Sequence, residues 1–149
     1  MADRTAVADA LKKVLGNTYS LYVKTHAYHW NVTGPNFASL HAMFMEQYTA
    51  MWQSLDEIAE RIRALGEWAP GSSQALAQLS DIDEGDNGVP CAETMLANLI
   101  DGHEKWVSGA EAALDIASEE GDTGTEDLLT PLIAAHEKTI WMLKATLGD

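Results

Sequence analysis

Hydrophobic residues recur every three or four positions through four long segments of this 149-residue chain. That spacing places them on one stripe of an α-helix, whereas a half-buried strand would alternate at every second residue. Long helices are expected at about 3–31, 36–65, 90–120 and 123–147, and a short helix at 74–79. Because no segment has the alternation of a strand, the sequence predicts an all-α fold.

The four long predicted helices have at least about twice the mean helix length, which is roughly 11–12 residues. A helix with one apolar stripe buries that stripe against neighbouring helices, which favours a four-helix bundle. A chain of this length corresponds to one ordinary domain. We therefore expect a single domain over 1–149, with the short helix inside a long connection, 67–89, between helices two and three.

Several residues mark where the helices should begin. Asn36 is expected to cap helix two, and Pro90 is tolerated at the first position of helix three. The segment 123–126 has the pattern of a capping box for helix four. On the surface of helix two, Glu57 and Arg61 are spaced to form an ion pair.

The charge of the chain limits its partners. There are 23 acidic and 9 basic residues, a formal net charge of −14. Such a surface repels polyphosphates and concentrates cations, so we expect no direct binding of DNA. No apolar run approaches the roughly 18 residues of a membrane span, and the N-terminus lacks a secretory signal pattern. We expect a cytoplasmic protein without membrane contact, nucleoid-associated only if DNA binds. Cys91, the single cysteine, excludes an intrachain disulfide and is expected to be buried.

Two histidines and two carboxylates are the candidate site residues. His29 falls near the end of helix one, whereas His41, Asp56 and Glu60 fall on helix two. Because fifteen residues of helix rise by ~22 Å, one ion cannot contact both His41 and Asp56. If these residues share a metal ion, the imidazoles of one chain must meet the carboxylates of another. An antiparallel pairing across a two-fold axis would achieve this and create two equivalent sites.

The same residues also have plainer interpretations. Asp56 and Glu60 could belong to a solvated helix face, and His29 and His41 could be ordinary polar residues. None of the five histidines follows a glutamate by three positions, so the usual ligand set of an intrachain di-iron site is absent. Mixed imidazole and carboxylate ligation suits iron(II), manganese or zinc. Residue spacing alone leaves these alternatives open.

The stretch KTHAYHWNVTGPNF at 24–37, followed by His41 and by LDEIAERI at 55–62, resembles the signature of the Dps family, the mini-ferritins. With the helix pattern and HEKTIWML at 136–143, the resemblance covers nearly the whole chain. It implies a ferritin-like bundle assembled as a hollow dodecamer. It also implies oxidation of iron(II), with hydrogen peroxide preferred over oxygen, storage of the ferric mineral inside, and protection against oxidative stress.

The resemblance also assigns roles to residues. His29 and His41 would be ligands from one subunit, and Asp56 and Glu60 would be ligands from its two-fold mate. Family members often have an Asp or Glu four residues after the second histidine, where this chain has Met45. Whether one or two irons bind each site, which oxidant is preferred, and whether zinc competes therefore stay open.

Further residues are expected near the site or along the path of iron. His26, Trp30 and Glu46 are expected beside the ligands without being ligands of the main set. The same resemblance implies that Trp30 also quenches one-electron oxidants. The junction of helices three and four is acidic, and its acids either stabilise the start of helix four or line a three-fold pore through which iron enters. These acids are Asp122, Glu126 and Asp127.

Two other classes of function remain as alternatives. The first is a DNA-compacting member of the same family, although such members usually rely on lysine-rich tails, which this chain lacks. The second is a non-catalytic helical interaction protein whose acidic residues only keep it in solution.

Overall fold

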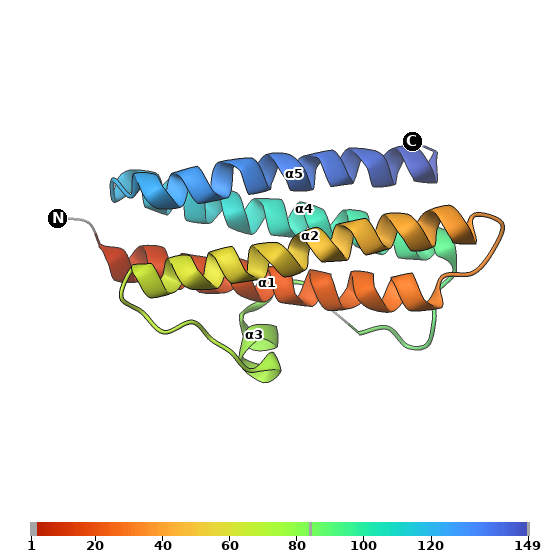
Figure 1. The fold of residues 1–149 in the computed structure, drawn as a ribbon, viewed down its shortest axis with the longest axis horizontal. Coiled ribbons are helices and arrows are strands. Elements are labelled where there is room, and N and C mark those ends of the chain that lie inside the picture. The colour runs from red at the N-terminus through yellow and green to blue at the C-terminus, as the bar shows by residue number, and fades with distance from the viewer. Residues whose placement is uncertain (1–2, 84, 149) are drawn as a thin grey trace.

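The computed structural model describes residues 3–83 and 85–148. It contains four long helices, α1 (Arg4–Asn31), α2 (Phe37–Ala64), α4 (Ala92–Glu119) and α5 (Thr123–Leu147), and a short helix, α3 (Ser73–Leu79) (Figure 1). Within these residues there is no β-strand. The all-α bundle with a short extra helix in the long connection is therefore confirmed.

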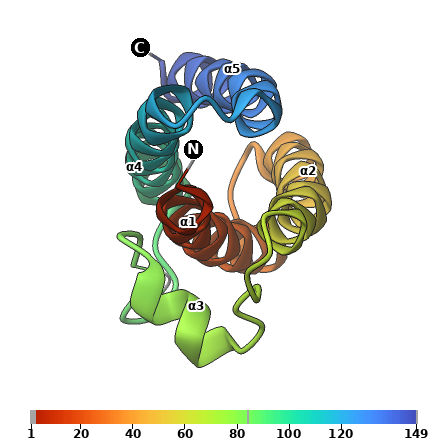
Figure 2. The same ribbon diagram turned by 90° about the vertical axis from the view of Figure 1, so that its left-hand side faces the viewer.

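The four long helices surround a common core, and α3 lies outside the bundle against α1 (Figure 2). Helix α1 packs against both α2 and α4, and α5 packs mainly on α4. Helices α2 and α5 contact each other only sparsely. The predicted apolar stripes supply the core, and each fully buried large side chain contributes about 1.5–3 kcal/mol relative to exposure. Its largest members include Trp106, Phe44, Leu11, Leu21, Ile58 and Leu99.

Helix α5 is less buried than its pattern predicts. Leu129 and Leu143 are completely buried, but Leu132, Ile140 and Leu147 are only half-buried. The cause is the sparse contact between α5 and α2, which leaves one flank of the α5 stripe uncovered. None of the described helices is both long and apolar enough to cross a membrane.

Helix α3 approaches α1 at a position without a side chain. A Cβ atom at Gly16 would lie 2.7 Å from the carbonyl oxygen of Leu76 and 3.0 Å from the Cβ of Leu79. Beside it, the buried amide oxygen of Asn17 accepts a hydrogen bond of 2.8 Å from the main-chain N–H of Asp81. Glycine is therefore required for this close approach of the two backbones.

One predicted helix start is confirmed and another is wrong: α2 begins directly after Asn36, whereas α4 does not begin at Pro90. Asn36 makes no side-chain cap, and its main-chain carbonyl accepts from the N–H of Leu40 instead. Helix α4 begins two residues after Pro90, because the carbonyl of Cys91 accepts the first helical hydrogen bond, from Met95. Cys91 is therefore an exposed N-cap residue, and the prediction that it would be buried is also wrong.

The start of α5 is capped by an aspartate rather than by the predicted box at 123–126. The side chain of Asp122 accepts from the N–H of Thr125 at 3.1 Å and from its hydroxyl at 2.6 Å. It also forms an ion pair of 2.6 Å with Arg61 at the end of α2. Arg61 is thereby drawn away from Glu57, and the predicted pair on α2 is not formed.

Candidate functional site

The two candidate histidines lie face to face across the turn between α1 and α2. The rings of His29 and His41 are stacked, with centroids 3.8 Å apart and planes inclined by 15°. Nδ1 of His29 donates to the main-chain oxygen of His41 at 2.6 Å, and Nδ1 of His41 donates to the main-chain oxygen of His29 at 2.7 Å. Each histidine therefore holds the other in position.

This reciprocal bonding decides which nitrogen of each ring is available. A carbonyl oxygen can only accept, so Nδ1 carries the proton in both rings. An imidazole whose single proton is on Nδ1 keeps its lone pair on Nε2. Histidines that bind metals are commonly oriented by this kind of bond from their second nitrogen. The pair thus has the hydrogen bonding of two metal ligands.

Aromatic side chains surround the pair. The ring of His26 stacks on Tyr48 at 4.0 Å and lies 4.2 Å from Trp30, and its Nδ1 is 3.2 Å from the hydroxyl of Tyr22. Burial, followed by the charge of His29, lowers the pKa of His26, so that this ring stays neutral around pH 7. His26 thus lies 6.2 Å from the ring of His29, and Trp30 packs on His26, while their expected roles stay a prediction.

The third expected neighbour lies on another side of α2. Glu46 lines a cavity between α2 and α5 together with Gln47 and His136. Met45, which occupies the position of the additional family carboxylate, is half-exposed. Successive residues of a helix point about 100° apart, so Glu46 does not take the place of Met45.

The two candidate carboxylates lie one turn apart near the other end of α2. Asp56 and Glu60 are both exposed. The negative charge of Asp56 raises the pKa of Glu60, and the charge of Glu57 acts in the same direction. No lysine, arginine or histidine among the described residues forms an ion pair with either carboxylate. A bound cation would relieve the repulsion between them.

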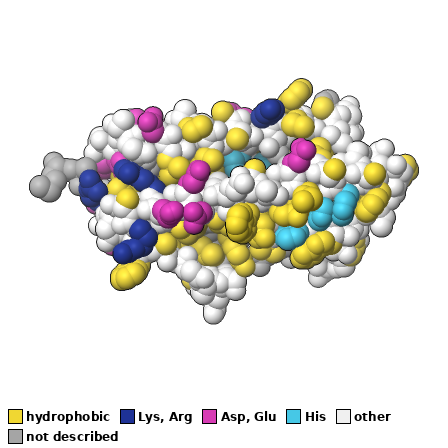
Figure 3. All heavy atoms as spheres, viewed as in Figure 1, with side chains coloured by type: hydrophobic (Ala, Val, Ile, Leu, Met, Phe, Trp, Pro, Cys, Tyr) yellow, Lys and Arg dark blue, Asp and Glu magenta, His cyan; other side chains and the backbone are white. Residues whose placement is uncertain are grey.

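One histidine, His41, and both carboxylates of the candidate site belong to one stripe of α2. Its members follow one another at intervals of three or four residues and so lie on the same side of the helix. In Figure 3, histidines gather toward the N-terminal end of α2, acidic side chains toward its C-terminal half, and hydrophobic side chains between them. We call this row the α2 stripe: Phe37, His41, Met45, Tyr48, Trp52, Asp56 and Glu60.

The middle of the α2 stripe is an uncovered apolar surface. Trp52 is 61% exposed and Met45 50%, although both are large hydrophobic side chains; Phe37, at the N-terminal end of the stripe, is also exposed. Beside them, Asp56 and Trp52 line a groove of about 730 Å³ against α1 and α3. Large exposed apolar surfaces rimmed by polar groups are typical of protein interfaces.

Within one chain, the imidazoles and the carboxylates do not meet. No three His, Cys, Asp or Glu side chains of the described residues come together in an arrangement that could hold a metal ion. Along a straight helix, His41 and Asp56 are separated by ~22 Å. Within one chain, the candidate histidines and the candidate carboxylates therefore form two separate groups.

The acids expected to line a pore have different surroundings. Partial burial alone would raise the pKa of Asp122, but hydrogen bonds from Thr125 and Arg61 outweigh it, and the pKa lies below its usual value. Glu126 is half-buried in the first turn of α5, and Asp127 is exposed. Asp122 thus serves as a cap within its own chain, and the pore stays a prediction.

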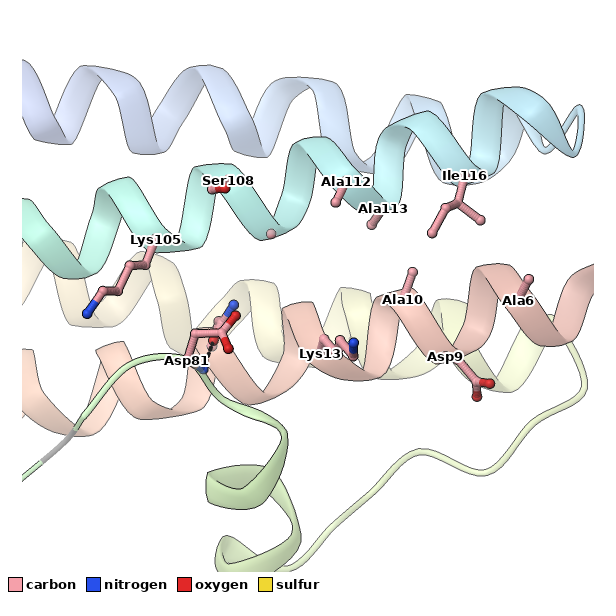
Figure 4. Close-up of a pocket in the computed structure, with 12 residues that line it drawn as sticks. Ala6, Asp9, Ala10, Lys13, Asp81, Lys105, Ser108, Ala112, Ala113 and Ile116 are labelled. Atoms are coloured by element: carbon pink, nitrogen blue, oxygen red, sulfur yellow. Dashed lines mark hydrogen bonds between the residues drawn. The ribbon is translucent and has the colours of Figure 1, made fainter.

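A groove of about 590 Å³ between α1 and α4 lies apart from these residues (Figure 4). Small apolar side chains such as Ala10 line it, and its charged lining residues are Asp9, Lys13, Asp81 and Lys105. None of its described lining residues is a histidine or a cysteine, so it does not contribute to the candidate site.

Sequence reasoning missed two features. The reciprocal bonds of His29 and His41 were not predicted, because they depend on how α1 and α2 pack after the turn. A second contact, between His103 and His136, was also not predicted, because each residue only appeared as a member of a core stripe. The available signal was that His103 falls on the buried face of α4 and His136 on the buried face of α5.

Comparison with known proteins gives a consistent result. The family model of the ferritin-like domain matches residues 8–149. The chain is 40% identical over 143 residues to an uncharacterized low temperature-induced protein of Nostoc sp., covering 95% of this chain and 80% of the relative. It is 37% identical over 141 residues to the DNA protection during starvation protein of Brevibacillus brevis, covering 95% and 94%.

The fold is also similar to that of a solved structure over nearly the whole chain. The Dps protein from Vibrio cholerae O1, a member of a broad superfamily of ferritin-like diiron-carboxylate proteins, superposes with a TM-score of 0.92 at 34% identity. The match covers 97% of this chain and 90% of that chain.

Proposed function

Since the chain belongs to the Dps family of ferritin-like proteins, we propose that it oxidises iron(II) and stores the ferric product inside a hollow homo-oligomer. Removal of iron(II) and of peroxide would protect the cell against oxidative stress. The observation that carries the proposal is the reciprocal bonding of His29 and His41, which leaves two neutral Nε2 lone pairs for a metal ion. Iron is here both substrate and cargo.

A two-fold axis near the middle of the α2 stripe would complete the site. In an isologous contact, the stripe of one chain runs antiparallel to the same stripe of its partner. The apolar centre around Trp52 then meets its own copy, and the histidine end meets the carboxylate end of the partner. Burial of this centre contributes about 25 cal/mol per Å² of apolar surface. Each dimer would contain two equivalent sites.

The charges of the four ligands favour the oxidised ion. Two neutral imidazoles, from His29 and His41, and two carboxylates, Asp56 and Glu60, balance the charge of iron(II). When the ion loses an electron, the same carboxylates stabilise the added positive charge. A small number of protein ligands also leaves coordination positions free for an oxidant.

Hydrogen peroxide is the proposed oxidant. Two iron(II) ions each give one electron, and one peroxide takes both electrons and two protons to form two waters. The sites would work within a dodecamer of cytoplasmic protein, and the negative charge of the chain would attract iron(II) toward it. Asp122, Glu126 and Asp127 are the proposed acids along the path of iron.

The charge of the chain also bears on the two alternatives. A net charge of −14 disfavours direct contact with the phosphates of DNA, so DNA compaction is not part of the proposal. A passive interaction protein would explain the exposed apolar centre of the α2 stripe, but it would not explain why both histidines point their Nδ1 atoms at carbonyl groups.

Stopped-flow absorbance tests the proposed activity directly. Apoprotein mixed with iron(II) and peroxide should form ferric product much faster than the protein-free mixture, and the variant Asp56→Asn/Glu60→Gln should lose this acceleration. The matched control is Glu111→Gln/Asp115→Asn, which removes the same charge from an exposed pair of acids one turn apart on α4. Equal rates with and without protein would contradict the proposal.

A further inference from the structure

A second pair of histidines lies inside the bundle, away from the α2 stripe. His103 of α4 and His136 of α5 are 1% and 6% exposed, and their Nδ1 atoms are 2.9 Å apart. The ring of His136 lies flat against Trp106, with centroids 3.5 Å apart and planes inclined by 8°. The indole N–H of Trp106 in turn donates to the hydroxyl of Thr18 at 2.8 Å. The pair is therefore held firmly in place.

Both histidines are neutral. Burial lowers the pKa of His103 to about 3. Burial, followed by the repulsion that a protonated His103 would exert, lowers the pKa of His136 well below its usual value. A hydrogen bond between two Nδ1 atoms requires that one ring donate and the other accept. When His103 donates, its Nε2 atom keeps a free lone pair.

His103 lines a cavity of about 260 Å³ between α2, α4 and α5, and the atom that matters there is its Nε2. It is buried and has no hydrogen-bond partner among the described residues. On the α2 side of the same cavity, Gln47 is 9% exposed, and its Oε1 atom also lacks a partner there. Buried polar atoms without partners are costly, by about 1–3 kcal/mol each, and therefore require an explanation.

We propose that this cavity binds a divalent transition-metal ion such as Zn²⁺, with Nε2 of His103 and Oε1 of Gln47 as ligands and the carboxylate of Glu46 as a third. We call this the bundle site. It is separate from the proposed iron site, and neither proposal depends on the other. Both unpartnered atoms would be satisfied by a single ion.

The surroundings suit such an ion. Neutral imidazole favours zinc, copper, iron and nickel over magnesium and calcium. Glu46 lines the cavity and is exposed at α2, so its charge can offset part of the charge of the ion. His136 accepts the Nδ1 hydrogen bond of His103 and so orients the ligand ring, as outer partners of metal-bound histidines do. His136 is thus a positioning residue.

Zinc binding can be measured by equilibrium dialysis and elemental analysis. The parent for this test is Asp56→Asn/Glu60→Gln, which removes the carboxylates of the proposed iron site. We expect one Zn²⁺ per chain at the bundle site in this parent. In the same background, Gln47→Leu should weaken binding at least tenfold, whereas Gln47→Glu should strengthen it because a carboxylate replaces the amide. Gln78→Leu, an exposed change on α3, is the matched control.

A second readout tests the histidines. Co²⁺ bound in place of Zn²⁺ should give visible absorption bands that are lost in His103→Leu. His136→Phe keeps a flat ring against Trp106 but removes the acceptor, so it should weaken binding roughly 10–100-fold. Circular dichroism checks that each variant is folded. The proposal is overturned if folded Gln47→Leu and His103→Leu bind as much zinc as the parent, which would mean that only water fills the cavity.

Discussion

The two ends of α2 differ in how their chemistry is held. At the N-terminal end, His41 is locked to His29 by two hydrogen bonds of 2.6 and 2.7 Å and by ring stacking. At the C-terminal end, Asp56 and Glu60 are exposed, repel each other, and have no basic partner among the described residues. One end is preorganised by its own chain, and the other lacks the positive charge that would organise it.

This difference shows where each half obtains its stability. The histidine end contributes to the fold of the single chain, because its hydrogen bonds join α1 to α2. The carboxylate end costs the single chain free energy, which only a cation or another molecule can offset. Such strain without local compensation is typical of functional positions.

Trp52→Glu should have the largest effect, because it places a charge in the apolar centre between the two ends. In the antiparallel register that brings His41 opposite a partner carboxylate, the new charge would be buried in the apolar contact between the two stripes, where it has no partner. We expect smaller assemblies in analytical ultracentrifugation and loss of iron oxidation, while circular dichroism of the helices stays unchanged. The exposed substitution Trp68→Glu, on the loop after α2, is the control. A Trp52→Glu variant with unchanged assembly would place the interface elsewhere.

His29→Ala/His41→Ala should damage both activity and stability. The variant loses both nitrogen ligands, so the rate of iron oxidation should fall by more than the roughly 10–100-fold typical of losing an outer partner of a ligand. It also loses two hydrogen bonds between α1 and α2, worth about 0.5–1.5 kcal/mol each. Denaturant unfolding measures the second effect. If the double variant keeps the free energy of unfolding of the wild type, these hydrogen bonds do not stabilise the packing of α1 against α2.

Asp56→Asn/Glu60→Gln should abolish iron oxidation without lowering the stability of the fold. Iron oxidation should be lost as in the histidine variant, but the melting temperature should stay the same or rise, because the repulsion between the carboxylates is removed. Differential scanning calorimetry without metal makes this comparison. A clear fall in melting temperature would mean that these carboxylates have structural partners, contrary to the proposed role.

A smaller effect concerns pH. The pKa of Glu60 lies above its usual value because Asp56 is nearby, so this site takes up a proton and loses affinity for iron(II) as the pH falls through that raised pKa. In the unliganded chain, the same raised pKa means that stability increases as the pH falls through it. Asp56→Asn should return the pKa of Glu60 toward its ordinary value. Carboxyl NMR titration measures this shift, and an unmoved Glu60 would exclude the coupling.

Much of the fold follows from the sequence. Apolar periodicity located the four long helices, because residues three apart such as Leu11 and Val14 share a face of a helix but lie on opposite faces of a strand. The errors lie at helix ends, where single hydrogen bonds decide the boundary. The carbonyl of Cys91, rather than Pro90, begins α4, and the side chain of Asp122 caps α5.

The site was only partly accessible from the sequence. Helix length predicts that His41 and Asp56 cannot share an ion within one chain, and this needs no tertiary information. The bonds between His29 and His41 depend on the path of the turn between α1 and α2, and the contact of His103 with His136 depends on how α4 packs against α5. Residue spacing does not determine such packing.

Coexpression of two inactive variants tests the shared site most directly. One variant is His29→Ala/His41→Ala, and the other is Asp56→Asn/Glu60→Gln, each with its own affinity tag. A mixed dimer across the proposed two-fold axis contains one intact site and one doubly broken site. Random mixing in equal amounts therefore restores roughly a quarter of wild-type iron oxidation. If double-tagged assemblies with proven mixing stay as inactive as the separate variants, the site is not shared between chains.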